Sequence, residues 1–199
     1  ACTNQLANGG FEQGRTVWTE SSMRGYALIC TATSCGASIP PHAGSYLSWL
    51  GGANSETSEV RQTLTLPAGK PAYLAFQYQI LSNDYCGYDY GYVQVIDSGV
   101  TRTVKRYNLG TTAKTAAWTG AQFDLSAYAG RAITVIFRVK TDASYSSSFF
   151  VDSAALTQAS VCAAGVNGVE AWESVEAVEE AASAEVKPAT PAGAEASER

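Results

Sequence analysis

Apolar and polar residues alternate along five short segments, which span residues 60–66, 74–80, 92–96, 133–140 and 149–155. Because side chains two positions apart lie on the same face of a strand, each segment offers one face to a core and the other to solvent or to a second layer. Turn residues such as Pro67 and Gly69 separate the segments. Before residue 163 the sequence has no convincing helical period. The pattern predicts an all-β, jelly-roll-like antiparallel β-sandwich.

Residues 163–199 differ in kind, because they are rich in Ala, Glu and Val and end in a Pro-containing segment. Within them, residues 168–179 repeat every three positions as Gly-Val-Glu, Ala-Trp-Glu, Ser-Val-Glu and Ala-Val-Glu. This composition suits a short helix over 169–184, an extended segment along a partner, or a disordered linker. We therefore predict a module over 1–162 and an acidic tail over 163–199. Trp172 would be the interface contact if the tail packs on a neighbouring chain.

Charge is sparse and unevenly distributed. Charged residues make up 16% of the chain and hydrophobic residues 46%, which is typical of extracellular β-sandwiches. Up to residue 162 there are 11 Lys+Arg and 10 Asp+Glu, a net charge of +1, whereas the remainder has 2 and 8, a net charge of −6. Neither part has the basic stripe that nucleic-acid binding requires.

The chain also lacks a segment of the roughly 20 apolar residues that a membrane helix needs, so we expect no membrane span. No basic segment precedes an apolar one at the start, so we expect the numbering to begin at a mature N-terminus after removal of a signal peptide. Both features favour a secreted protein at the cell surface.

The five cysteines lie at positions 2, 30, 35, 86 and 162 and indicate an oxidising compartment. Cys30 and Cys35 are expected to clip a local loop, and Cys2 and Cys162 to join the two ends of the β region. In an antiparallel pair the two residue numbers have a constant sum, and 2+162 equals 12+152, so the same register would place Glu12 beside Asp152. Cys86 is left over as a free thiol, an interchain partner or a small buried residue.

Catalysis is not expected. The only histidine, His42, follows two prolines, and no nucleophile elbow or metalloprotease motif accompanies it. A glycosidase would need two acids across a cleft, but nothing distinguishes Glu56, Glu59, Asp84 and Asp89 from solvated loop residues.

Tyrosines are concentrated between residues 85 and 92. Tyr88, Tyr90 and Tyr92 would share one strand face, which is either exposed for binding or part of the core, and core is the commoner outcome. Tyr85 and Tyr145 are expected in loops and, with Tyr88, are the candidate contacts for a ligand or a protein partner. An exposed tyrosine offers a flat apolar ring and a hydroxyl, which suit sugars and protein surfaces alike.

Four motifs in order resemble bacterial extracellular jelly-roll modules of the carbohydrate-binding or MAM-like type, which are appended to secreted proteases and glycosidases. They are Asn8-Gly9-Gly10-Phe11-Glu12 with Trp18, the segments 88–93 and 124–130, and Phe149-Phe150-Val151-Asp152. The resemblance covers about residues 6–157 and implies the jelly-roll fold, with a first and a last strand that lie together.

The resemblance also implies a structural calcium ion bound by Glu12 and Asp152. Two carboxylates forced together repel each other unless one is protonated or a cation lies between them, and calcium prefers oxygen ligands. Asn8 and the backbone near Ser45 are candidate additional ligands. The alternative is two surface carboxylates paired with arginines. Many relatives have a second Asp after the first, where this chain has Ser153.

These features predict a non-catalytic extracellular interaction module that binds surface glycan or protein, with the tail as a route to self-assembly into homo-oligomers. The alternative is a structural subunit of an extracellular fibre, sheath or surface layer. A third interpretation is an accessory domain cut from a larger secreted hydrolase. Fold-level resemblance alone does not choose among them.

Overall fold

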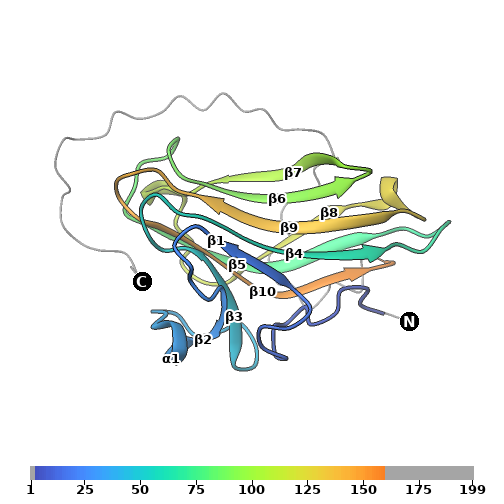
Figure 1. The fold of residues 1–199 in the computed structure, drawn as a ribbon, viewed down its shortest axis with the longest axis horizontal. Helices are drawn as coiled ribbons and strands as arrows, with labels where there is room; N and C mark the ends of the chain where they lie inside the picture. Colours follow the sequence, from blue (N-terminus) through green and yellow to red (C-terminus); the bar gives the residue numbers. More distant parts are fainter. Residues whose placement is uncertain (1–2, 160–199) are drawn as a thin grey trace.

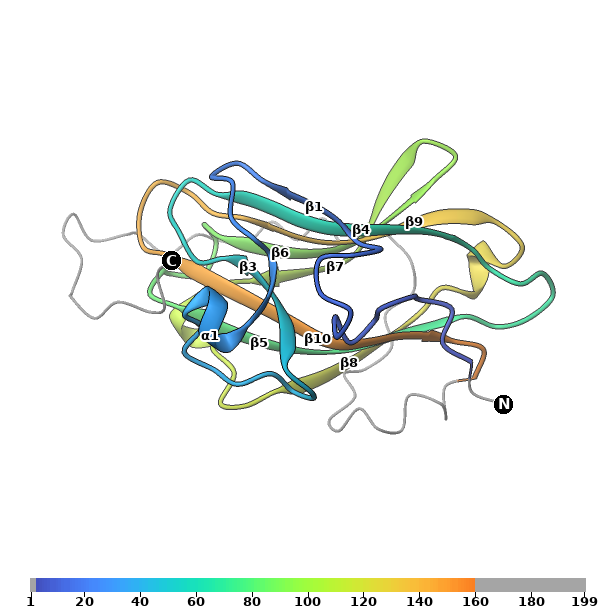
Figure 2. The same cartoon turned by 60° about the horizontal axis from the view of Figure 1, so that its bottom comes forward.

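The structure is a computed structural model that describes residues 3–159. Two five-stranded antiparallel sheets stack on each other (Figures 1 and 2). The first sheet has the order β1 (Thr19–Ser22), β4 (Thr57–Thr65), β9 (Ala132–Lys140), β6 (Tyr90–Asp97) and β7 (Val100–Asn108). The second has the order β2 (Ile29–Thr31), β3 (Tyr46–Gly51), β10 (Ser147–Thr157), β5 (Tyr73–Ser82) and β8 (Thr119–Asp124). The predicted all-β sandwich is confirmed.

Helical structure within the described residues is limited to three short turns, which are α1 (Ala32–Cys35), η1 (Thr111–Ala113) and η2 (Ser126–Tyr128). The five alternating segments correspond to β4, β5, β6, β9 and β10. In the part of the chain that the structure describes, no helix is long and apolar enough to cross a membrane.

The inner faces of the two sheets enclose one apolar core. Phe76 of β5 and Phe137 of β9 meet across the sandwich with ring centroids 4.9 Å apart, and both are fully buried. Tyr78 stacks on Phe149 of the neighbouring strand at 5.6 Å. Burial of side chains of this size stabilises the fold by about 2–3 kcal/mol each, so this core holds the two sheets together.

A second, smaller core covers the outer face of the second sheet. Residues 32–45, which we call the clipped loop, contain α1 and lie beside β2 and β3 (Figure 2). Cys35, Ala37 and Ile39 of the loop pack on outward-facing side chains of the sheet, which are Leu47, Trp49, Leu81, Trp118 and Phe150. The clipped loop therefore covers part of the outer face of the second sheet.

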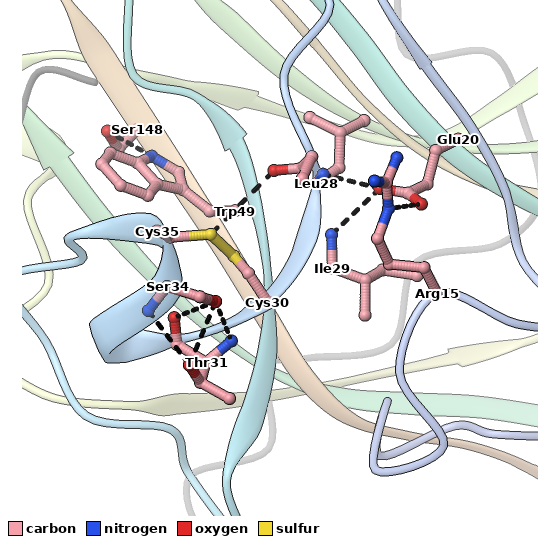
Figure 3. The surroundings of a disulfide bond; sticks show 11 residues. Arg15, Glu20, Leu28, Ile29, Cys30, Thr31, Ser34, Cys35, Trp49 and Ser148 are labelled. Carbon is pink, nitrogen blue, oxygen red and sulfur yellow. Dashed lines mark hydrogen bonds and ion pairs between the residues drawn. A yellow bond between two sulfur atoms is a disulfide. The ribbon is translucent and has the colours of Figure 1, made fainter.

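The disulfide between Cys30 and Cys35 holds the clipped loop, with the two Cα atoms 5.8 Å apart (Figure 3). Thr31 and Ser34 form a capping box, in which each side chain bonds the other residue's backbone amide. Beneath them Trp49 donates from Nε1 to Ser148 Oγ over 2.9 Å, and both residues are fully buried.

The N-terminal segment runs along the second half of β10, but not in the register expected from the cysteines. Gln5 donates its amide to the carbonyl of Leu156, and Ala154 donates to the carbonyl of Gly9. A side chain at Gly9 would collide with the Ala154 carbonyl, so glycine is required there. The expected register is wrong, because these two bonds join residues whose numbers sum to 161 and 163 rather than 164, so strand pairing does not place Glu12 beside Asp152.

Candidate functional site

Glu12 and Asp152 nevertheless meet at one loop. The Glu12 carboxylate accepts hydrogen bonds from the amides of Ser45 and Tyr46 at 2.9–3.0 Å. Asp152 accepts from the amide of Ala43 at 3.1 Å and from that of Ser153 at 2.6 Å. The end of the clipped loop, residues 42–46, therefore gathers both carboxylates that the family resemblance pairs.

The two carboxylates differ in exposure and interact electrostatically. Asp152 is fully buried, whereas Glu12 is exposed. The pKa of the Asp152 carboxyl is raised from 3.8 to about 6, because burial and, less strongly, the negative charge of Glu12 outweigh the backbone amides of Ala43, Ser153 and His42, which lower it. A cation placed here would interact with both negative charges, because both carboxylates accept amides of the same short segment.

Asn8, the candidate additional ligand, lies in the turn before Glu12. Its Oδ1 accepts from the amide of Gln13 at 2.9 Å, and its Nδ2 donates to the carbonyls of Gly14 and Thr16 at 3.1 Å. The Asn8 side chain thus shapes the turn that carries Glu12, and its oxygen is already used.

A second acidic group lies at the end of the sandwich where β5 leads into β6 and β9 into β10. Carboxylate oxygens of Asp84, Asp89 and Asp142 lie within 4.8 Å of one another, an arrangement that could hold a metal ion. Asp84 and Asp89 are fully buried, so the expectation that they are solvated is wrong, as it is for the fully buried Glu56. Sequence reasoning missed this group because Asp142 lies far from the other two along the chain.

Two of the predicted contact residues lie in the same two loops. The rings of Tyr85 and Tyr145 meet edge to face with centroids 6.5 Å apart, and both side chains are partly exposed. Tyr88 lies in the turn before β6 and is also partly exposed.

Among the described cysteines Cys86 alone is free, and its Sγ lies 3.0 Å from Thr112 Oγ1. Trp172, the tail and the expected disulfide between Cys2 and Cys162 lie outside the described residues.

The outer face of the first sheet carries a row of half-buried aromatic and charged side chains. We call Glu59, Arg138, Tyr92, Arg106 and Tyr90 the tyrosine–arginine face. Adjacent strands bring the first four into register, since Glu59 pairs with Arg138, Arg138 with Tyr92 and Tyr92 with Arg106. All four are partly exposed. The expectation that Tyr90 and Tyr92 belong to the core is therefore wrong.

Tyrosine rings and guanidinium groups are in direct contact on this face. The Arg106 guanidinium lies 4.7 Å from the Tyr90 ring centroid, and the Tyr90 and Tyr92 centroids are 6.3 Å apart. Partial burial raises the pKa of Tyr92, while the positive charges of Arg106 and Arg138 lower it. The Nε of Arg138 is buried and has no hydrogen-bond partner among the described residues.

A groove extends the surface along the same sheet. It has a volume of about 530 Å³ and is lined in part by Thr19, Arg61 and Thr63, which face outward from β1 and β4. Val17, which is 50% exposed, forms part of its wall. Gln5 and Ala7 of the N-terminal segment also line this groove.

No protein-family model and no curated protein sequence matches this chain. Solved structures do. A carbohydrate-binding module, CBM61, in complex with β-1,4-galactotriose is 20% identical with a TM-score of 0.59, over 79% of this chain and 99% of that one. The K3 cleaved adhesin domain of Lys-gingipain from Porphyromonas gingivalis is 16% identical with a TM-score of 0.56, over 79% and 99% of the two chains. A CBM22 xylan-binding domain from Paenibacillus barcinonensis is 15% identical with a TM-score of 0.51, over 79% and 95%.

Each match covers nearly the whole of the other domain. At these identities the similarity establishes the fold. The chain therefore has the jelly-roll fold found in carbohydrate-binding modules and in adhesin domains.

Proposed function

We propose that this protein is a non-catalytic extracellular module that binds carbohydrate through the tyrosine–arginine face. The observation that carries the proposal is the row of half-exposed Tyr92, Arg106 and Arg138 across adjacent strands of an otherwise polar sheet face. Similar structures are named as carbohydrate-binding modules and adhesin domains, which supports binding rather than catalysis. The disulfide supports an extracellular location, because such bonds persist in oxidising compartments.

The chemistry of this face suits sugar rings. A tyrosine ring presents a flat apolar surface to the C–H face of a sugar, and its hydroxyl can donate or accept a hydrogen bond. Guanidinium groups donate to hydroxyl or carboxylate oxygens in a fixed geometry. The buried Nε of Arg138 offers a donor that the described residues leave unused. Since the row of side chains crosses three adjacent strands, we propose a polysaccharide chain rather than a small sugar as the ligand.

The test is a screen of immobilised polysaccharides followed by affinity measurements on variants. Tyr92→Ala should weaken binding at least about 10-fold, which corresponds to about 1.4 kcal/mol. Tyr73→Ala is the matched control, because Tyr73 is also half-buried but lies on β5 of the other sheet. Equal losses in the two variants, or no binding to any polysaccharide by the wild type, would contradict the proposal.

We further propose that Glu12 and Asp152 hold a structural calcium ion at the end of the clipped loop. Gly44 supports the fit, because a side chain there would occupy the place of the Glu12 carboxylate. Calcium would offset the repulsion between the two carboxylates, and binding only to the folded state stabilises it. EDTA should lower the melting temperature of the wild type, and Glu12→Gln should reduce that difference. An unchanged melting curve in EDTA would refute this site.

The alternative of a fibre, sheath or surface-layer subunit depends on the tail with Trp172, outside the described residues. Glycan binding has the support of a defined surface, so we favour it. Binding to a cell-surface protein through Tyr85, Tyr88 and Tyr145 remains a separate proposal, which Tyr145→Ala would test by loss of adhesion without loss of glycan binding.

A further inference from the structure

Three aspartates, two of them fully buried, meet at the end of the sandwich. Asp84 and Asp89 are fully buried and Asp142 is half-buried, and one carboxylate oxygen from each lies within 4.8 Å of the others. Buried carboxylates need compensation, because the loss of hydration costs several kcal/mol per ion.

Hydrogen bonds compensate only part of the buried Asp89 carboxylate. Its Oδ1 accepts the amide of Asp142 over 2.7 Å, but its buried Oδ2 has no hydrogen-bond partner among residues 3–159. A fully buried oxygen without a donor, beside two other carboxylates, is the feature that a bound cation would explain.

The geometry points to a calcium ion held by Asp84, Asp89 and Asp142, which ties the β5–β6 loop to the β9–β10 loop. Calcium binds six to eight oxygens at about 2.3–2.6 Å, so two ligands on opposite sides of the ion lie up to about 5 Å apart. The 4.8 Å spread of the three oxygens fits that range. Magnesium demands a stricter octahedron and keeps its waters, which suits a buried three-carboxylate site less well.

The consequence is a fixed arrangement of the two loops that carry Tyr85 and Tyr145. Tyr85 follows Asp84 directly and donates its amide to Asp84 Oδ1 over 2.7 Å. Tyr145 lies three residues after Asp142, in the loop where Asp142 Oδ1 accepts the amide of Ser144 at 3.0 Å. Calcium at this site would therefore order this end of the sandwich, whether or not the tyrosine–arginine face binds carbohydrate.

Calcium titration by calorimetry on the EDTA-treated full chain tests the inference. Asp89→Asn keeps the acceptor for the Asp142 amide but removes the charge, and it should lose one calcium site or bind there at least about 10-fold more weakly, since even a neighbour of a metal ligand changes affinity by that much. Glu12→Gln should retain this site. Asp124→Asn is the matched control, because Asp124 also accepts one backbone amide, from Ser126.

Stability measurements separate loss of metal from loss of fold. In EDTA, Asp89→Asn should melt at the same temperature as the wild type or higher, because a buried charge has been removed, whereas in calcium the wild type should gain more than the variant. If Asp89→Asn unfolds, Asp142→Asn serves as the second variant. Wild-type calcium binding in Asp89→Asn and Asp142→Asn, or loss of all calcium binding in Glu12→Gln, would overturn the inference.

Discussion

The outer faces of the two sheets differ in solvent exposure, although both carry large aromatic side chains. On the second sheet, Trp49 and Phe150 lie 5.3 Å apart and are fully buried beneath the clipped loop. On the first sheet, Tyr90 and Tyr92 stay half-exposed beside arginines. One face has become a second core, and the other keeps polar groups and rings accessible. An aromatic row on a strand therefore indicates a binding surface only when no other segment covers it.

The largest expected effect on stability is on the outer face of the second sheet, which the clipped loop covers. Trp49→Ala should cost about 3–5 kcal/mol in the free energy of unfolding, because it leaves a cavity and deprives Ser148 of its buried hydrogen bond. Urea denaturation measures this loss, with Trp49→Phe as the milder control that keeps the packing. If Trp49→Ala is as stable as the wild type, the clipped loop does not form a true second core.

The next effect concerns what holds the loop in place. Replacement of Cys30 and Cys35 together by serine should lower the free energy of unfolding by about 2 kcal/mol, the loop-entropy value for so short a loop. Cys86→Ser is the matched control, because Cys86 is outside the described disulfide and should change stability little. Limited proteolysis should then cut first within residues 32–45. Equal protease resistance in both variants would mean that packing alone holds the loop.

A third prediction concerns the pH dependence of stability, and it compares two buried aspartates, one near each outer face. Asp152 lies under the end of the clipped loop and Asp89 beside Tyr90, and burial raises the pKa of each carboxyl, to about 6 and about 7. Between pH 4 and those values the unfolded state releases protons that the folded state keeps. Stability in EDTA should therefore be greatest below pH 4 and fall as pH rises to about 7.

This loss follows from the raised pKa of both carboxyls. Urea denaturation at pH 4.5 and pH 7.5 in EDTA measures it. The charges that face Asp89 are those of Asp84 and Asp142. Asp89→Asn should flatten the pH dependence more than Asp152→Asn does, and a slope unchanged in both variants would contradict the account.

The smallest effect on stability is expected on the tyrosine–arginine face. Arg106→Ala should change the free energy of unfolding by no more than about 0.5 kcal/mol, because its side chain is only half-buried and lies outside both cores. Arg102→Ala, an exposed arginine on the same strand, is the matched control. The two variants should differ in polysaccharide affinity but hardly in melting temperature. A large loss of stability in Arg106→Ala alone would assign that residue a structural role.

Sequence pattern predicted the strands whose residues alternate and missed β3 and β1, for opposite reasons. β4 and β9 alternate because one side faces the core and the other faces water. In β3, Leu47 to Leu50 are all buried, since the core lies on one side and the clipped loop on the other, so no alternation remains. β1 has no apolar residue, and it was missed for that reason.

The candidate sites show the same division between local pattern and tertiary contact. The inward side of β6 is taken by Gly91, Val93 and Val95, and this alternation already places Tyr90 and Tyr92 outside. Attention to those small residues could have corrected the core expectation. The burial of Asp84 and Asp89 has no such local signal, because it depends on Asp142 from a distant loop.

The most direct test of the central claim is a nuclear magnetic resonance titration of the isotope-labelled protein with a polysaccharide fragment found in the screen. Backbone amide shifts map the surface that the ligand covers. We expect the largest changes in β6, β7 and β9 around Tyr92, Arg106 and Arg138, and little change in residues 32–45. If the largest changes lie on the clipped loop, or at Tyr85 and Tyr145 alone, they would contradict the assignment of the tyrosine–arginine face as the binding surface.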